Sequence, residues 1–228
     1  TNFATAAAAD QAWFNSDFHR LEFLAELGRF FRRMPDYPPM AQLDQLAAKS
    51  RVYPQGIDPM PPRPPRPPGP LRVLWAARWE YDKNPDHFFA AVAHLRASGV
   101  DFRLNVVGEQ FEQTPPVFAA AREEFADRID RWGYLDSRED YLRCLVESDI
   151  VVSTALHEFF GVTIVEAAAA GAFPVLPNRL AYPELFPPDT FSDFFYDGSV
   201  QALNKKLLTL RDRFTHTGTV WPPDPPPV

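Results

Sequence analysis

The chain has 228 residues, of which 46% are hydrophobic and 23% are charged, and its formal net charge is −7. This composition is typical of a globular protein, and the acidic balance argues weakly against a nucleic-acid binder. Its single cysteine, Cys144, excludes an internal disulfide, and no apolar run approaches the roughly 20 residues that a membrane span needs. The sequence starts Thr-Asn-Phe, with neither an initiator Met nor a signal peptide, and we expect it to be cut from a longer protein.

The first part of the chain predicts a short α/β segment. Residues 11–15 read as a strand, and Ser16 is suited to cap a helix that continues to about Arg33, where prolines end it. A second helix is expected over residues 41–48 and a second strand over residues 51–53.

A proline-rich stretch, residues 59–70, separates the two patterned parts of the chain. Proline lacks a backbone N–H and fixes φ, so this stretch predicts an extended connector rather than a helix or a central strand. We place the domain boundary here and interpret the stretch as a stiff linker. The alternative is a PxxP ligand for a partner module.

Beyond the linker, strands alternate with helices. Strands are expected at residues 71–76, 101–107, 129–132, 149–153 and 173–176, and helices at residues 85–98, 116–125, 138–147 and 161–170. Such alternation predicts an α/β fold with a parallel, doubly wound, Rossmann-like sheet. We expect this domain to cover residues 71–215 and residues 216–228 to form a disordered tail.

In such sheets, ligands bind beyond the carboxyl ends of the strands. The loop after the first strand carries Arg78 and Lys83, whose planar guanidinium and compact ammonium suit a diphosphate; a solvated loop is the alternative. Gly108 ends the second strand, where a glycine lets the backbone approach a ligand closely. The absence of a GxGxxG motif disfavours a dinucleotide dehydrogenase.

The loop before residue 161 carries the most specific pattern. The free N–H groups of Gly161, Val162 and Thr163 open a helix and predict an anion site for a phosphate. Glu158 lies just before this helix, and Glu166 lies about a turn and a half into it. Two carboxylates beside a phosphate site suit a ligand that joins a sugar, a diphosphate and a nucleoside, because carboxylates would only repel a bare phosphate.

Glu158 and Glu166 enclose seven residues. This spacing resembles the Glu-x7-Glu signature of retaining glycosyltransferases of family 4, which have the two-domain GT-B fold. The resemblance implies that Glu158 contacts the donor sugar, that Glu166 contacts the ribose, and that Arg78 and Lys83 bind the diphosphate. It covers about residues 71–212.

Three further residues are candidates for donor binding. Tyr134 lies in a Gly-Tyr-Leu segment that resembles the family's segment beside the nucleobase. His157 and Phe160 flank the first glutamate of the signature. Packing is the alternative for His157 and for Phe160.

A narrower resemblance, to the tRNA-queuosine mannosyltransferases, rests on four segments. They are residues 14–19, 34–36, 157–161 and 182–187. This resemblance implies transfer of mannose from GDP-mannose onto queuosine at the wobble position of an aspartate tRNA. It also implies a cytoplasmic protein with a nucleotide sugar and a tRNA as its partners.

A GT-B N-terminal domain is a complete Rossmann-like unit, but only about sixty residues precede the linker. We therefore interpret residues 1–58 as the C-terminal remnant of an N-terminal acceptor domain. The family's N-terminal histidine and the acceptor site are expected outside this chain, which by itself is expected to be inactive.

For the complete enzyme, the resemblance implies transfer with retention, with the departing diphosphate stabilised by Arg78, Lys83 and the helix start at Gly161. No cofactor and no metal are expected, since the sequence lacks an Asp-x-Asp motif and the cations neutralise the charge. Three alternatives stay open: a family 4 enzyme with a glycan or lipid acceptor, a non-catalytic nucleotide-sugar-binding module, and a nucleotide-sugar epimerase.

Overall fold

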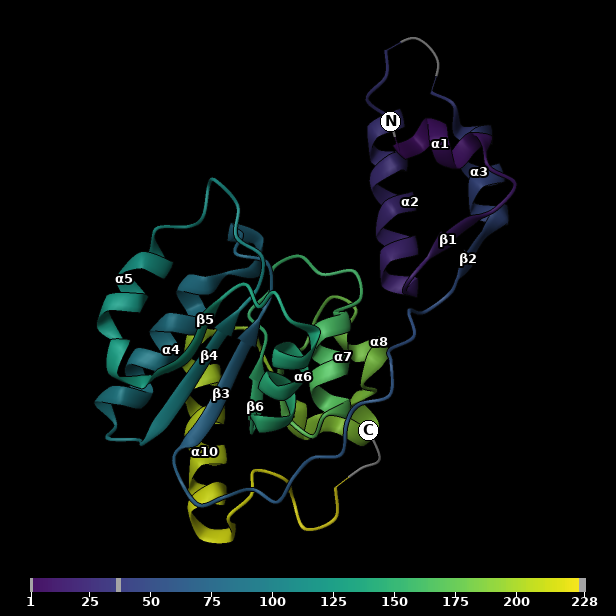
Figure 1. The fold of residues 1–228 in the computed structure, drawn as a ribbon. Helices are drawn as coiled ribbons and strands as arrows, with labels where there is room; N and C mark the ends of the chain where they lie inside the picture. Colours follow the sequence, from purple (N-terminus) through teal and green to yellow (C-terminus); the bar gives the residue numbers. More distant parts are fainter. Residues whose placement is uncertain (1, 36–37, 226–228) are drawn as a thin grey trace.

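The computed structural model of the chain describes residues 2–35 and 38–225, which form a small N-terminal lobe and a larger domain (Figure 1). The elements of the lobe are α1 (Asn2–Ala8), β1 (Ala12–Phe14), α2 (Asp17–Phe31), α3 (Met40–Lys49) and β2 (Ser50–Val52). The two strands pair in parallel. The lobe has its own core, formed by Ala12, Phe14, Leu27, Phe31 and Leu46.

Most elements of the lobe lie where the sequence predicts them. Ser16 caps α2 as predicted, because its hydroxyl accepts a hydrogen bond from the N–H of His19. The helix α1 was not predicted. The third residue of the 34–36 segment, Asp36, lies outside the described residues.

The larger domain is built on a six-stranded parallel sheet. Its strands are β3 (Leu71–Ala76), β4 (Phe102–Val107), β5 (Ile129–Gly133), β6 (Ile150–Val152), β7 (Phe173–Pro177) and β8 (Phe195–Tyr196). They pair in the order β5-β4-β3-β6-β7-β8. The chain therefore moves outward in opposite directions from β3 and from β6, which makes the ends of these two strands the switch point of the sheet.

Helices connect and cover these strands. They are α4 (Pro85–Ala97), α5 (Val117–Glu124), α6 (Arg138–Glu147), α7 (Val162–Ala169), the short α8 (Tyr182–Leu185) and α9 (Pro188–Phe191), and the long α10 (Val200–Thr217). Packing under helices explains why β3 is a nearly continuous apolar run. The elements α8, α9, β8 and α10 were not predicted. None of the described helices is long and apolar enough to cross a membrane.

The segment after α10 differs from the expectation of a disordered tail over residues 216–228. Helix α10 continues to Thr217, and Val220 is buried. The ring of Trp221 packs edge-on against Phe173 at a centroid distance of 5.1 Å. Its indole N–H donates to the carbonyl of Gly171 at 3.0 Å, so the amphipathic side chain holds this segment on the domain.

Two arginines of the proline-rich linker bind the larger domain. The buried carboxylate of Asp149 accepts hydrogen bonds from Arg66, at 2.6 and 2.7 Å, and from Arg63, at 3.1 Å. Arg66 also lies over the ring of Phe214, at 4.7 Å from its centroid. Both arginines of the stretch are thus engaged within the chain, as expected for a linker that is held against the domain.

Replacing Asp149 with Asn removes the charge that Arg63 and Arg66 share. Because the carboxylate is buried, we expect this change to lower the free energy of unfolding by about 3 kcal/mol, measured by urea denaturation. Asp101→Asn, which alters an exposed carboxylate 3.9 Å from Arg128, is the matched control and should cost less than about 0.5 kcal/mol. An unchanged unfolding midpoint for Asp149→Asn would contradict this account of the linker.

Candidate functional site

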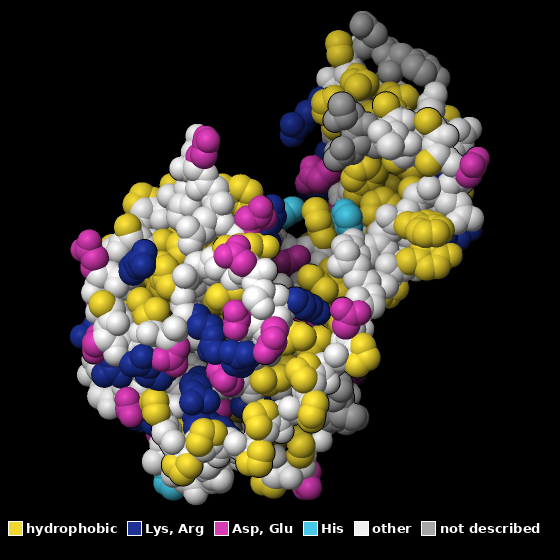
Figure 2. All heavy atoms as spheres, in the orientation of Figure 1, with side chains coloured by type: hydrophobic (Ala, Val, Ile, Leu, Met, Phe, Trp, Pro, Cys, Tyr) yellow, Lys and Arg dark blue, Asp and Glu magenta, His cyan; other side chains and the backbone are white. Residues whose placement is uncertain are grey.

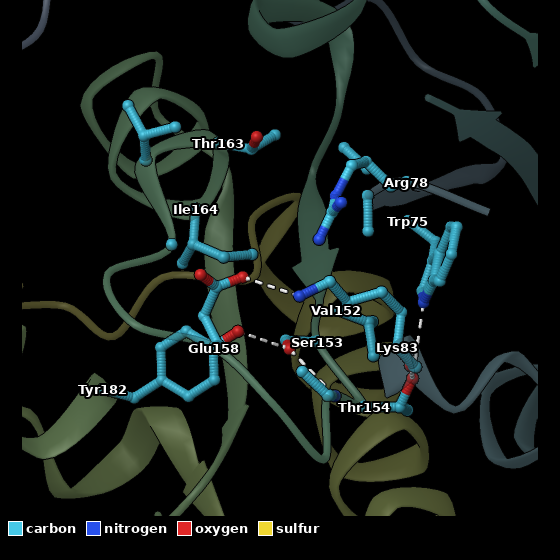
Figure 3. Close-up of a pocket in the computed structure, with 15 residues that line it drawn as sticks. Trp75, Arg78, Lys83, Val152, Ser153, Thr154, Glu158, Thr163, Ile164 and Tyr182 are labelled. Carbon is cyan, nitrogen blue, oxygen red and sulfur yellow. Dashed lines mark hydrogen bonds and ion pairs between the residues drawn. The ribbon is translucent and has the colours of Figure 1, made fainter. Parts of the chain in front are cut away.

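A cavity of about 280 Å³ opens at the carboxyl ends of β3 and β6 (Figure 3). Its polar lining comes from the loops after these strands and from the start of α7, and includes Arg78, Lys83, Glu158 and Thr163. The predicted residues of two separate loops and of the start of α7 therefore meet at the switch point of the sheet, where ligands of such folds bind.

Lys83 joins two of these loops. Its side chain is only 8% exposed, and its ammonium donates to the carbonyl of His157 at 2.6 Å and to the carboxylate of Glu158 at 3.3 Å. A second carboxylate, that of Asp82, lies 3.3 Å away. The backbone carbonyl of Lys83 also accepts a hydrogen bond from the hydroxyl of Thr154. The ammonium is thus a fixed positive charge at the wall of the cavity.

The carboxylate of Glu158 is held from two sides. One oxygen accepts from the N–H groups of Phe159 and Phe160 at 3.0 and 3.3 Å, and the other accepts from Lys83. Figure 3 shows Glu158, Lys83 and Tyr182 converging in the cavity. Each carboxylate oxygen keeps a lone pair with which it can accept a hydrogen bond from a ligand hydroxyl.

The phenol of Tyr182 lines the same cavity and lies 2.7 Å from the hydroxyl of Ser153. Burial first, and then the charge of Glu158, raise the pKa of Tyr182 well above its ordinary value. The side chain therefore stays a neutral hydroxyl at any working pH.

The start of α7 supplies the anion-binding geometry that the sequence predicts. Gly161 takes a left-handed conformation, with φ of +91°, and a Cβ there would lie 3.0 Å from the ring of Tyr182. The N–H groups of Val162 and Thr163 have no acceptor within the described part of the chain. Together with the positive end of the helix dipole, they can receive a phosphate oxygen.

Arg78 is the more exposed of the two cations that line the cavity. Its side chain is 53% exposed and pairs with Glu80 at 3.0 Å. Figure 3 shows it pointing toward the middle of the cavity. Unlike Lys83, it forms no hydrogen bond or ion pair with another loop of the described chain, and its guanidinium can pair with a ligand in a bidentate way.

A second cavity of about 180 Å³ adjoins the first, and Arg78 and Thr163 line both. Gly108 and Tyr134 line the second cavity, together with Tyr141. The two cavities form one elongated site with a cation at its middle, which suits a ligand with a charged centre and a group on either side.

Glu166 lies beside the second cavity without lining it. The carboxylate is buried and accepts hydrogen bonds from the hydroxyl of Tyr141 at 2.6 Å and from Arg138 at 3.1 Å. Burial and the bond to Glu166 raise the pKa of Tyr141, which keeps this phenol protonated as the donor.

Gly108 is required by packing. Its φ is +151°, and a Cβ there would lie 1.8 Å from the carbonyl oxygen of Ala77, in the loop after β3. The close approach that the glycine permits is thus between two loops of the site, and it shapes the wall of the second cavity.

The structure does not bring His157 and Phe160 into either cavity. His157 is exposed and its ring meets Phe159 edge-on, at a centroid distance of 4.4 Å, while Phe160 is buried in the fold. Both lie on the loop that carries Glu158, which agrees with the packing alternative. The described residues hold no group of three or more His, Cys, Asp or Glu side chains suited to a metal ion.

Comparison with known proteins places this geometry in a family. A model of the family described as "Glycosyl transferases group 1" matches residues 57–212. The chain belongs to this family. Residues 1–57 match a second family model, described as "tRNA-queuosine alpha-mannosyltransferase N-terminal".

This group 1 glycosyltransferase chain is 35% identical to a tRNA-queuosine alpha-mannosyltransferase of Drosophila melanogaster, over 88% of the chain and 54% of that protein. It is 27% identical to a GDP-mannose-dependent alpha-(1-6)-phosphatidylinositol dimannoside mannosyltransferase of Mycobacterium tuberculosis, over 75% of the chain and 46% of that protein. The chain thus spans about half the length of the curated relatives it matches.

Solved structures show the same fold. Sucrose-phosphate synthase of Thermosynechococcus elongatus superposes with a TM-score of 0.68 and 17% identity, over 96% of this chain and 53% of that one. A glycosyltransferase of Rickettsia africae superposes with a TM-score of 0.67 and 18% identity, over 92% and 55%. The predicted α/β, GT-B type of fold is therefore confirmed.

Some residues of the group 1 site were not singled out from the sequence. Ser153 and Thr154 follow β6, and Trp75 is the second-last residue of β3, with its indole N–H donating to Thr154. Their position at strand ends is a signal that sequence reasoning can use. The partners of Glu166 carried no such signal, since Arg138 and Tyr141 lie on another helix.

The loop that carries Glu158 also touches the small lobe. The ring of His19 stacks on that of Phe159, with centroids 3.9 Å apart, and its Nδ1 lies 2.7 Å from the side-chain oxygen of Asn15. Figure 2 shows histidine side chains between the lobe and the larger domain. Burial first, and then the charge of His157, lower the pKa of His19 from its ordinary value of 6.5.

We predict from this that His19 titrates below 6.5, measured by NMR, and that His157→Asn moves its midpoint upward. Because the folded-state pKa is lowered, the unfolded chain binds the proton more readily. The contribution of His19 to the free energy of unfolding is therefore highest above pH 6.5. It falls as the pH drops from 6.5 through the folded-state pKa of His19. A midpoint of His19 at or above 6.5 would overturn this prediction.

Proposed function

We propose that this chain provides the donor-binding domain of a retaining mannosyltransferase that uses GDP-mannose and transfers mannose to queuosine in tRNA. The observation that carries the donor assignment is the meeting of Arg78, Lys83 and Glu158 at the start of α7. The acceptor assignment is supported by the resemblance of residues 1–57 to the queuosine mannosyltransferase family model and by the fly relative.

In this proposal the diphosphate lies between Arg78, Lys83 and the free N–H groups of α7. The mannose hydroxyls bind Glu158, whose carboxylate is already oriented by Lys83. The nucleoside enters the second cavity beside Gly108 and Tyr134, with its ribose toward Glu166. Arg78, Lys83 and the start of α7 all carry positive charge or partial charge and repel one another. The negative diphosphate between them reduces this repulsion.

The reaction breaks the bond between the anomeric carbon and the diphosphate oxygen and forms a bond from that carbon to the acceptor oxygen on the same face. The acceptor proton leaves with the diphosphate oxygen. Negative charge develops on the diphosphate, and Arg78, Lys83 and the α7 dipole stabilise it at fixed positions. In this scheme side-chain cations neutralise the charge without a metal.

A tRNA acceptor would place this activity in the cytoplasm and would make tRNA the macromolecular partner. A second candidate acceptor is a glycan or lipid, and the mycobacterial relative favours it because that protein is a phosphatidylinositol dimannoside mannosyltransferase.

The donor site is tested with Arg78→Ala and Lys83→Ala. Each removes a cation from the proposed diphosphate site, so we expect each to weaken GDP-mannose binding by more than about tenfold, or about 1.4 kcal/mol, in isothermal titration calorimetry. Lys205→Ala, which removes an exposed cation of α10, is the control and should leave the affinity unchanged. Tighter binding of another nucleotide sugar would reassign the donor, and unaltered affinity in Arg78→Ala would remove this residue from the site.

The acceptor is tested by release of GDP from GDP-mannose with tRNA that carries queuosine or guanosine at the wobble position. Release that depends on queuosine is the expected result. Because the chain spans 54% of the fly relative, it is also assayed when joined to the part of that relative that the match does not cover. Binding without release in both forms would favour the non-catalytic module, and an isomerised sugar without acceptor would favour an epimerase.

A further inference from the structure

The small lobe contacts the larger domain through the first turn of α2. The carboxylate of Glu184, in α8, accepts hydrogen bonds from the N–H groups of Asp17 and Phe18 at 2.8 and 3.1 Å. The hydroxyl of Ser16 donates to the carbonyl of Phe159 at 2.5 Å, and the ring of His19 stacks on Phe159. Figure 1 shows this end of α2 directed toward α8.

These contacts satisfy groups that a helix start leaves without partners. The first N–H groups of a helix have no intrahelical acceptor, and a carboxylate is favoured at this positive end of the dipole. Glu184 receives two of these N–H groups from across the junction, and Ser16 receives that of His19. Ser16 is buried, so its two hydrogen bonds are shielded from water.

The same contacts are connected to the residues of the donor cavity in two ways. Phe159, whose carbonyl binds Ser16, is the chain neighbour of Glu158, and its N–H donates to that carboxylate. Tyr182 lies in the same short helix as Glu184 and lines the cavity beside Gly161. A displacement of α2 therefore moves the peptide that orients the Glu158 carboxylate.

We infer that Ser16, His19 and Glu184 form an inter-lobe clasp that positions Glu158 for the donor sugar. They act as positioning residues, since none of them lines the cavity. The inference rests on the proposed function in assigning the sugar to Glu158. It also joins two segments that were singled out from the sequence, residues 14–19 and 182–187, into one structural element.

The clasp should affect the affinity for GDP-mannose and the affinity for GDP differently. Among the described residues, no hydrogen bond or ion pair joins Glu184 to Arg78 or Lys83, whereas the N–H groups that orient Glu158 lie beside the carbonyl that binds Ser16. Opening the clasp should therefore weaken binding of the sugar-bearing nucleotide more than binding of GDP.

The test measures affinities for GDP-mannose and for GDP by calorimetry in Glu184→Ala, Glu184→Gln and Ser16→Ala. We expect Glu184→Ala and Ser16→Ala to weaken GDP-mannose binding about tenfold while GDP affinity stays within about twofold. Glu184→Gln keeps one acceptor oxygen and should show a smaller loss. The control Glu139→Ala removes an exposed carboxylate that pairs with Arg143 in α6, and should change neither affinity.

Hydrogen exchange supplies a readout that does not depend on the ligand. Exchange of the Phe159 and Phe160 N–H groups, which bind Glu158, should accelerate in Glu184→Ala while that of β3 and β4 stays unchanged. Equal losses for GDP and GDP-mannose, or unaltered exchange of these two N–H groups, would overturn the clasp. Absence of any nucleotide binding by the unaltered chain would instead defeat the proposed function, and hydrogen exchange would still decide whether the clasp orients the loop.

Discussion

The ammonium of Lys83 holds together the two loops on which the site depends. The connections after β3 and after β6 lead to opposite sides of the sheet. A crevice therefore remains between the loops that follow these two strands. Lys83 crosses that crevice, with its side chain bonded to the loop after β6 and its own carbonyl bonded to Thr154. Removing a nearly buried cation from between two carboxylates leaves both without their counter-charge, so binding geometry and local stability are coupled at this residue.

Much of the fold could be predicted from local pattern. The apolar run of β3, Pro85 at the start of α4 and Gly161 before α7 are signals within a few residues, and the elements follow them. Helix α10 carries a comparable signal, since Leu203, Leu207 and Leu210 are buried at helical spacing, but it was not predicted. The end of the chain was misjudged because its prolines outweighed Trp221, whose ring completes the packing around Phe173.

In the site, too, residues with a local signal could be predicted and contacts between distant segments could not. Arg78, Lys83, Glu158 and Gly161 lie in strand-end loops, and the parallel topology alone brings them together. Contacts that join distant segments had no local signal: Glu184 with the start of α2, and Asp149 with Arg63, depend on how separate elements pack. The motif alone could not show that His157 and Phe160 lie outside the cavity. Residues next to Glu158 in sequence do not all face the same side of the loop.

The linker arginine Arg63 connects the linker to the helix whose start lines the cavity. Besides Asp149, it binds the carbonyl of Gly171, just past the last residue of α7, and thereby sets a positive charge against the negative end of that helix. The helix has eight residues, so its two ends are about 12 Å apart. Its far end faces the cavity, and the peptide groups between them align head to tail. The connector between the two parts of the chain thus caps the C-terminal end of the helix whose start lines the cavity.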